Sequence, residues 1–133
     1  MSTPATEFSA PCIHYLRRNI SEADEGLGSL TLGVIPAKAI VVTAGVVVST
    51  AFNGTSPILD IGTSGDPDGY ATNLVLATAG LIVWDELATS NDFYSTSETT
   101  IVCDVSATGN DSTAGYGVVF VGFIPDNGVG RAS

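Results

Sequence analysis

Apolar and polar positions alternate along most of this chain with the period of two that is typical of β-strands. The clearest run is 40–48, which is rich in β-branched residues, a composition that favours a strand over a helix. Its alternate positions form two sets, each of which we expect on one face of the strand. One set is Ile40, Val42, Ala44, Val46 and Val48, and the other is Val41, Thr43, Gly45, Val47 and Ser49.

Shorter runs repeat the pattern and are separated by residues that favour turns. Strands are predicted at 30–33, 57–63, 80–87, 99–107 and 116–124, with a short edge strand at 93–96 and an ambiguous segment at 73–78. Turns or loops are predicted at 36–38, at Asn53-Gly54 with left-handed backbone, at 64–69 and at 108–115. Seven or eight strands without a helical period predict an all-β chain, a single antiparallel β-sandwich of the jelly-roll kind.

The first 28 residues differ from the rest, because no helical or strand period runs through them. They hold an isolated apolar cluster, two arginines and the acidic run 22–25. We therefore divide the chain into an extended N-terminal arm (1–28), a β-sandwich domain (29–126) and a C-terminal tail (127–133). An arm of this composition becomes ordered when its own domain or a neighbouring chain holds it.

Two of the predicted strands, 40–48 and 118–124, are apolar on both faces. A small sandwich has one core, so the second face of each strand should be polar. Apolar residues on that second face indicate a further layer, most simply another subunit, because monomers rarely expose large apolar patches. A central position in the sheet, or cover by the arm, would also explain the pattern.

Charge narrows the classes of partner. The chain of 133 residues carries 14 acidic and 4 basic residues, a formal net charge of −10. This balance speaks against binding to nucleic acid, which requires a basic surface, and against docking on an anionic membrane. The N-terminus has no secretory signal and the apolar run 39–48 is too short to span a bilayer, so we expect a soluble protein made in a cytoplasm.

Candidate catalytic groups are few. The one histidine, His14, lies two residues after Cys12, a spacing that places both on one face of a strand, but no third orienting group accompanies them. The second cysteine, Cys103, lies among apolar residues and is expected to be a buried, small hydrophobic side chain. A disulfide between the two is disfavoured in a reducing compartment and otherwise stays open. We expect neither an enzyme nor a bound metal or cofactor.

Carboxylates offer the remaining site chemistry. Asp60, Asp66 and Asp68 have oxygen ligands for calcium, although their spacing is not that of an EF-hand and Pro-Asp-Gly is also an ordinary turn. Trp84 beside Asp85 and Glu86 is consistent with an aromatic platform with flanking acids that binds a glycan, and also with a solvated strand end. A calcium or glycan site therefore remains an alternative interpretation.

Three segments carry a family resemblance: the run 33–46 (GVIPAKAIVVTAGV), the run 51–62 (AFNGTSPILDIG) and the loop 66–70 (DPDGY). In their residue pattern and their order along the chain, these segments resemble the small β-sandwich capsid cement, decoration or head-fibre proteins of tailed bacteriophages, over about residues 30–124. The resemblance implies a jelly-roll-like fold, a homotrimer on the outer capsid surface, contact with the major capsid protein and no enzymatic activity. It carries no diagnostic site residues.

The function expected from these observations is that of a virion structural protein, a cement or decoration protein that ties neighbouring major capsid subunits together. The alternative is a head-fibre, tail, or receptor- or glycan-binding module of a phage, with calcium as an optional stabilising ion. The candidate partner-binding residues all lie in the predicted arm: Phe8, Ile13, Tyr15, Leu16, Arg17 and Arg18. The two arginines would meet an acidic capsid surface, or form a solvated pair.

Overall fold

The computed structural model describes residues 13–83 and 93–126. Eight strands make up most of this part of the chain: β1 (His14–Ser21), β2 (Ser29–Ile35), β3 (Ile40–Thr50), β4 (Ile58–Thr63), β5 (Asp66–Val75), β6 (Gly80–Val83), β7 (Thr99–Ser106) and β8 (Tyr116–Ile124). One turn of 3₁₀-helix, η1 (Glu22–Asp24), follows β1. Among the described residues no helix is long or apolar enough to cross a membrane.

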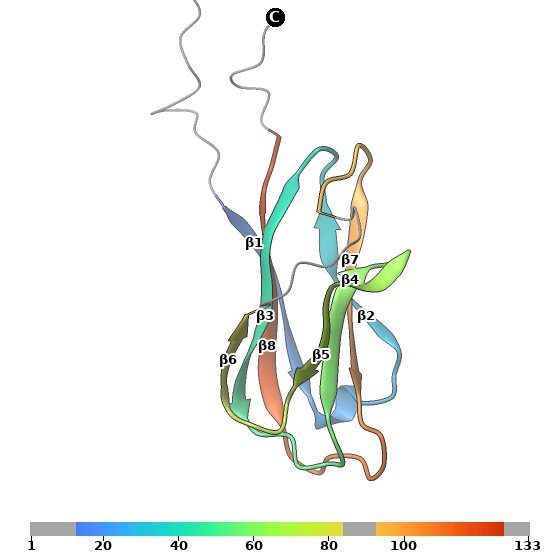
Figure 1. Cartoon of the computed structure of the whole chain (residues 1–133), viewed down its shortest axis with the longest axis vertical. Helices are drawn as coiled ribbons and strands as arrows, with labels where there is room; N and C mark the ends of the chain where they lie inside the picture. Colours follow the sequence, from blue (N-terminus) through green and yellow to red (C-terminus); the bar gives the residue numbers. More distant parts are fainter. Residues whose placement is uncertain (1–12, 84–92, 127–133) are drawn as a thin grey trace, which may run out of the picture.

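The strands form two four-stranded antiparallel sheets that pack face to face (Figure 1). Sheet A has the order β1-β8-β3-β6, and sheet B has the order β2-β7-β4-β5. The pairs β1–β8, β2–β7, β3–β6 and β4–β5 are those obtained when one long antiparallel ribbon folds back on itself and wraps around a core. This is the strand order of a jelly roll, so the predicted all-β sandwich is confirmed.

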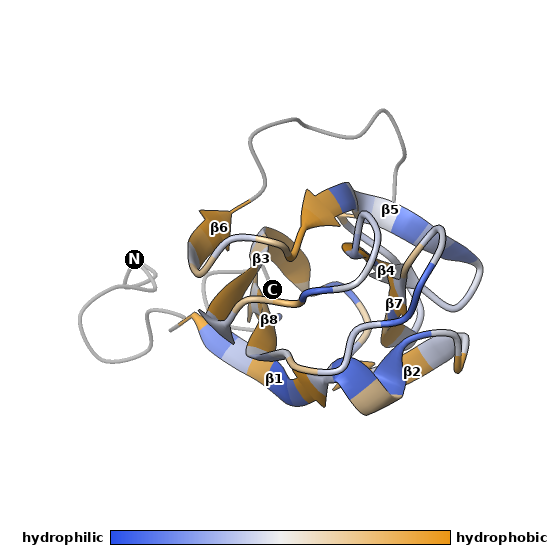
Figure 2. Ribbon diagram, turned by 90° about the horizontal axis from the view of Figure 1, so that it is seen from below, coloured by the Kyte–Doolittle hydropathy of each residue, from blue (hydrophilic) through white to orange (hydrophobic). Residues whose placement is uncertain are grey.

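The core lies between the inner faces of the two sheets (Figure 2). Alternate residues of the central strands are fully buried there, as the period of two predicted for β7 and β8. These residues are Ala44, Val46 and Val48 of β3, Leu59 and Ile61 of β4, Ile101, Cys103 and Val105 of β7, and Val119 and Val121 of β8. Apolar side chains from both layers thus remove one another from water, the main driving force for the fold.

The predicted faces of β3 need one correction. Val41 is buried and Ile40 is exposed, the reverse of the expected assignment at that end of the strand. The register against β8 shifts between Val41 and Thr43, where a β-bulge inserts one residue. A shift of one residue moves every following side chain to the other face. The predicted faces are therefore correct from Ala44 onward, beyond the bulge, and reversed before it at Ile40 and Val41.

Two predicted turns also differ. The loop expected at 64–69 is only the two residues Ser64 and Gly65, and β5 already begins at Asp66. Pro67 fits within that strand because β5 is an edge strand, where a missing N–H donor is tolerated. In the turn before β4 the left-handed residue is Ser56, with φ of 47°, and neither Asn53 nor Gly54 has positive φ.

The expectation that no strand runs through residues 1–28 is wrong for 14–21, which form β1 and pair along their whole length with β8. The inward positions of β1 are Leu16, Arg18 and Ile20, so a charged residue interrupts the apolar row that would have indicated a strand. Pairing with β8 supplies the backbone hydrogen bonds that the local pattern does not predict. The division between arm and domain is now a proposal about residues 1–12, which lie outside the described residues.

Other predictions have mixed outcomes. The segment 73–78 is strand only as far as Val75, and 93–96 contributes a single bridge between Tyr94 and Ile40. The predicted strand 80–87 is observed over Gly80–Val83. Its remaining positions lie outside the described residues.

Candidate protein-binding surface on sheet A

The outer face of sheet A carries a continuous set of apolar side chains, which we call the apolar face. Its members are Tyr15 of β1, Val47 of β3, Leu81 and Val83 of β6, and Tyr116, Val118, Phe120 and Ile124 of β8. Five of them are among the exposed large hydrophobic residues of the chain, with Leu81 at 63% and Tyr15 at 56%. Figure 2 shows β6 coloured as hydrophobic along its length.

Strand register places these side chains in rows that cross the sheet. In one row, Asn19, Val118, Val47 and Leu81 lie side by side on β1, β8, β3 and β6. In the next row the corresponding residues are Arg17, Phe120, Gly45 and Val83. The apolar members of both rows occupy the central strands and β6, whereas the polar members lie on the edge strand β1. A water-excluding centre with a polar rim is the usual anatomy of a protein–protein interface.

Two glycines make this face flat. A Cβ atom on Gly45 would come within 2.8 Å of the Phe120 ring, and one on Gly122 would come within 2.7 Å of the Tyr15 ring. The two rings therefore lie over glycine on the neighbouring strand, and they meet edge to face with their centroids 6.4 Å apart. Aromatic rings that cover glycines in this way protect the sheet backbone and lower the relief of the surface.

Charge is distributed unequally between the sheets. The four strands of sheet A contain Arg17 and Arg18 and no acidic residue. The four strands of sheet B contain Asp60, Asp66 and Asp68 with Asp104, and no basic residue. In a chain of net charge −10, the described strands of sheet A thus carry no carboxylate.

The structure divides the predicted arm residues into two groups. Tyr15 and Arg17 point to the outer face of sheet A, and Ile13 is exposed just before β1. Leu16 is half-buried and lies against the backbone of Gly33, where an added Cβ would come within 2.9 Å of it. Phe8 lies outside the described residues. A role of these residues in binding a partner stays a prediction.

Arg18 points inward at the open edge between the sheets. Its guanidinium donates a hydrogen bond from Nη1 to the carbonyl oxygen of Thr31 on β2, at 3.0 Å, while its buried Nε has no partner within the described structure. Arg18 thus helps to join β1 of sheet A to β2 of sheet B. Arg17, one residue earlier, keeps its side chain on the exposed face.

The outer face of sheet B carries the strand carboxylates beside two exposed valines, Val34 and Val75. Asp60 and Asp104 lie directly opposite each other on β4 and β7, and burial together with the nearby Asp60 charge raises the pKa of Asp104. The Asp60 carboxylate accepts hydrogen bonds from the backbone N–H of Asn73 at 2.8 Å and from the Thr72 hydroxyl at 3.3 Å.

The three aspartates considered for calcium are not brought together by β4 and β5. Asp66 pairs with Thr63 at the hairpin end, three positions along β4 from Asp60, a separation of about 10 Å along the strand. Within 13–83 and 93–126, no three His, Cys, Asp or Glu side chains gather closely enough to hold a metal ion. Trp84, Asp85 and Glu86, the other candidate glycan-binding group, lie outside the described residues.

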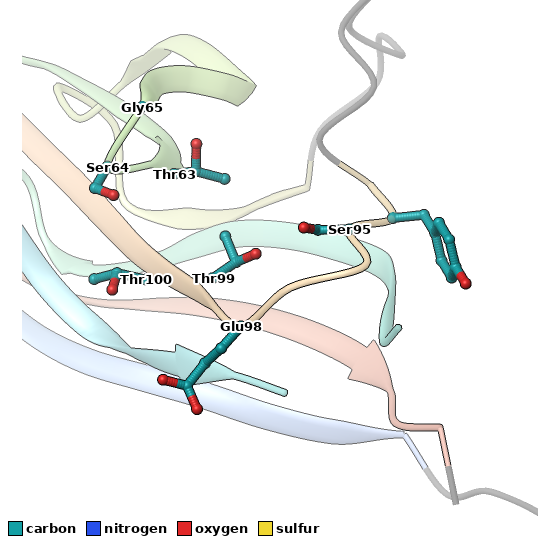
Figure 3. A pocket seen from close by; sticks show the side chains of 8 residues that line it. Thr63, Ser64, Gly65, Ser95, Glu98, Thr99 and Thr100 are labelled. Carbon is teal, nitrogen blue, oxygen red and sulfur yellow. The ribbon is translucent and has the colours of Figure 1, made fainter. Parts of the chain in front are cut away.

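A shallow polar pocket lies where the β4–β5 turn approaches the segment before β7 (Figure 3). Its volume is about 330 Å³. Hydroxyl groups dominate its lining, which consists of Thr63, Ser64, Gly65, Tyr94, Ser95, Glu98, Thr99 and Thr100. Several of these groups already bond within the chain, since the Thr63 hydroxyl accepts from the Asp66 amide and the Thr99 hydroxyl donates to the Ser97 carbonyl.

The remaining reactive side chains of the described residues, His14 and Cys103, pack against aromatic or apolar groups. His14 stacks on the Phe123 ring with centroids 5.8 Å apart. Cys103 is free and fully buried in the core, as predicted, and desolvation raises the pKa of its thiol to about 12. Cys12 lies outside the described residues.

Comparison with known proteins gives structural neighbours only. No family model matches the sequence, and no curated protein matches it. Among solved structures, a chain of the "Cyanophage Pam1 capsid asymmetric unit" superposes with a TM-score of 0.65 at 17% identity, over 94% of this chain and 92% of that one. A chain from the "Acidic stable capsid structure of Helicobacter pylori bacteriophage KHP30" gives 0.63 at 16% identity, over 86% and 89% of the two chains.

A third neighbour comes from the "Capsid of Ralstonia phage GP4", with a TM-score of 0.58 at 19% identity over 99% of this chain and 93% of that one. The structural neighbours belong to phage capsids. The chain thus has the fold of capsid-associated β-sandwich chains, and the overlap extends over nearly the full length of both partners.

The sequence predicted part of the apolar face. Apolar residues on both faces of 40–48 and 118–124 indicated β3 and β8, which are the two central strands of sheet A. The contributions of Leu81 and Val83 were not expected, because only the pairing of β6 with β3 brings them beside Val47 and Gly45.

Proposed function

We propose that this chain is a virion structural protein of a tailed bacteriophage, a cement or decoration protein that binds the major capsid protein on the outer surface of the capsid. The single observation that carries the proposal is the exposed apolar face of sheet A, which indicates assembly with further chains, on a fold shared with phage capsid chains. A monomer in water rarely leaves a patch of this kind uncovered. Its role is structural rather than catalytic, and its working form is a homotrimer.

In this proposal the N-terminal arm makes part of the contact with the capsid. Residues 1–12 precede β1 at the edge of sheet A, and they include Phe8 and Cys12. Ile13, just before β1, and Arg17, on this edge strand, have exposed side chains next to the arm. An apolar segment followed by a positive charge suits a neighbouring acidic protein surface.

The experiment begins with virions from a phage that encodes this chain and from a matched phage with an early stop codon in its gene. We expect the chain in purified wild-type virions at a constant ratio to the major capsid protein, measured by quantitative mass spectrometry. Purified chain added to the deficient particles should sediment with them. Its absence from purified wild-type virions would contradict the proposal. A variant lacking residues 1–12 tests the arm, which has no binding role if that variant still decorates particles at full occupancy.

A second candidate, a glycan-binding module of the virion surface, is favoured by the hydroxyl-lined pocket near Thr63 and Glu98. Hydroxyl and carboxylate groups are the usual partners of sugar hydroxyls. This candidate predicts a concentration-dependent rise in melting temperature with a glycan from the host surface, abolished by Thr100→Val or Glu98→Ala. No stabilisation at millimolar glycan would count against it.

A further inference from the structure

We infer that the apolar face of sheet A is the surface through which copies of this chain contact one another, leaving the acidic sheet B turned outward. This inference deepens the proposed assembly function, because it names the occupant of the exposed face. The occupant is a second copy of the same chain. Its support comes from the shape, the size and the charge of the face.

The shape suits a partner of the same kind. The rings of Tyr15 and Phe120 lie over Gly122 and Gly45, so they fill the space above the two glycines and lower the relief of the sheet face. Such a face packs well against another sheet face or edge, at a spacing of about 10 Å between layers. Copies arranged around a symmetry axis would turn these faces toward one another and bury them together.

The size is sufficient for a specific contact. Four strands at about 4.8 Å spacing give a width of about 19 Å, and the eight steps from Tyr116 to Ile124 give a length of about 27 Å. β6 has only four residues, so the face covers about 450 Å² per copy in projection, or about 900 Å² for two copies. Because side chains make the accessible area larger than the projection, the contact lies near the lower limit for a specific protein–protein interface, about 1,000 Å².

Charge selects a second copy over a basic partner. A basic protein would be drawn to sheet B, where Asp60 and Asp104 lie side by side. Two copies that met through sheet B would bring these carboxylates against their equivalents, at a cost in repulsion. Sheet A has no carboxylate in its strands, so two chains of net charge −10 can approach there without bringing strand carboxylates together.

The test is the mass of the full-length chain in solution, by light scattering coupled to size exclusion, in a dilution series from about 1 µM to about 100 µM. The variant Leu81→Asp places a carboxylate on the apolar face, on a side chain that is 63% exposed. The matched control is Leu27→Asp, at a leucine that is 65% exposed on the connection between η1 and β2. Circular dichroism and melting temperature verify the fold of both.

We expect an oligomer for the wild type and for Leu27→Asp, and at least about thirtyfold weaker association for Leu81→Asp, because the loss of a buried leucine is repeated in every copy. Should Leu81→Asp be misfolded, the double variant Val47→Thr with Val83→Thr replaces it. Threonine keeps the branched shape and strand preference of valine, and association should weaken about tenfold.

Salt separates an apolar contact between acidic chains from an ionic one. Raising NaCl from about 50 mM to about 500 mM should strengthen association, because it screens the repulsion between the copies. A wild type that is monomeric at about 100 µM, or an oligomer that neither set of variants weakens, would overturn the inference. Association that weakens with salt would also overturn it, in favour of a contact between sheet A and the acidic sheet B. These outcomes do not depend on the presence of the chain in virions, and light scattering separately reports whether the oligomer is a trimer.

Discussion

A partly buried hydrogen-bond cluster joins three distant parts of the chain and allows a quantitative test of the fold. The Glu25 carboxylate, just after η1, accepts hydrogen bonds from the backbone amide of Ser112 at 2.6 Å and from its hydroxyl at 2.8 Å. The same hydroxyl accepts a hydrogen bond from the Gly54 amide, also at 2.8 Å. Ser112 is buried, so each of these groups would lose its partner without easy replacement by water.

The expected magnitudes follow from those contacts. Hydrogen bonds to a charged acceptor contribute about 1.5–3 kcal/mol each, reduced here because Glu25 is only half-buried. We expect Glu25→Ala to lower the free energy of unfolding by about 2 kcal/mol. Ser112→Ala, which also leaves the Gly54 amide unpaired, should cost about 2 kcal/mol. Since both variants remove the bond between hydroxyl and carboxylate, the double variant should lose only about 3 kcal/mol, a coupling of about 1 kcal/mol.

Urea denaturation followed by circular dichroism measures all four corners of this cycle. Glu98→Ala, which removes an exposed carboxylate elsewhere, controls for the change in net charge and should leave stability within about 0.5 kcal/mol of the wild type. The melting temperature of Glu25→Ala should fall by about 6–10 °C for a chain of this length. A coupling below about 0.3 kcal/mol, or a loss below about 0.5 kcal/mol for Glu25→Ala, would refute the contribution assigned to this cluster.

Three further predictions concern single residues. Cys103, with its thiol pKa raised to about 12 by burial, should resist iodoacetamide at pH 8 in the folded chain and react only after unfolding, as peptide mapping would show. The pKa of Asp104 is raised on folding, so its negative charge destabilises the folded chain above that pKa, and this penalty vanishes as the pH falls below the ordinary pKa of an aspartate. Asp104→Asn should therefore increase the melting temperature slightly at pH 7 and not at pH 3. A decrease at pH 7 would contradict this. At Gly62 an added Cβ would clash with the backbone of Asp66 and Pro67, so Gly62→Ala should cost about 3 kcal/mol or more, whereas Gly65→Ala, with open space around it, should be neutral or slightly stabilising in the same urea assay.

Strand positions were readable from the sequence wherever the chain alternates without interruption. Residues 99–107 and 116–124 show this well, because Ile101, Cys103 and Val105 form one buried row in β7 as the period of two predicted. The apolar second faces of 40–48 and 118–124 agree with the alternative explanation, a central position in the sheet, because β3 and β8 are the central strands of sheet A. The partner layer that these faces also indicated stays a prediction.

Where sequence reasoning failed, a non-local contact had replaced the local signal. β1 has arginine at an inward position and was not recognised, because it is a strand by virtue of its pairing with β8. The β-bulge near Val41 exchanged the two faces at the start of β3, and nothing in the alternation marks where a bulge occurs. Asp66 and Asp68 were expected in a loop, yet β4 continues its hydrogen bonding across a two-residue turn into β5.

Local pattern thus specified an all-β chain, most of its strands and the apolar second faces of β3 and β8, since alternation and residue shape act over only a few neighbouring positions. The jelly-roll order of the strands determined which of them became neighbours. By pairing β6 with β3 and β1 with β8, it assembled Leu81, Val47, Phe120 and Tyr15 into one surface and collected the strand carboxylates on the opposite sheet. Neither the apolar face nor the charge asymmetry exists in the linear chain, because both depend on which strands become neighbours when the two sheets close around their core.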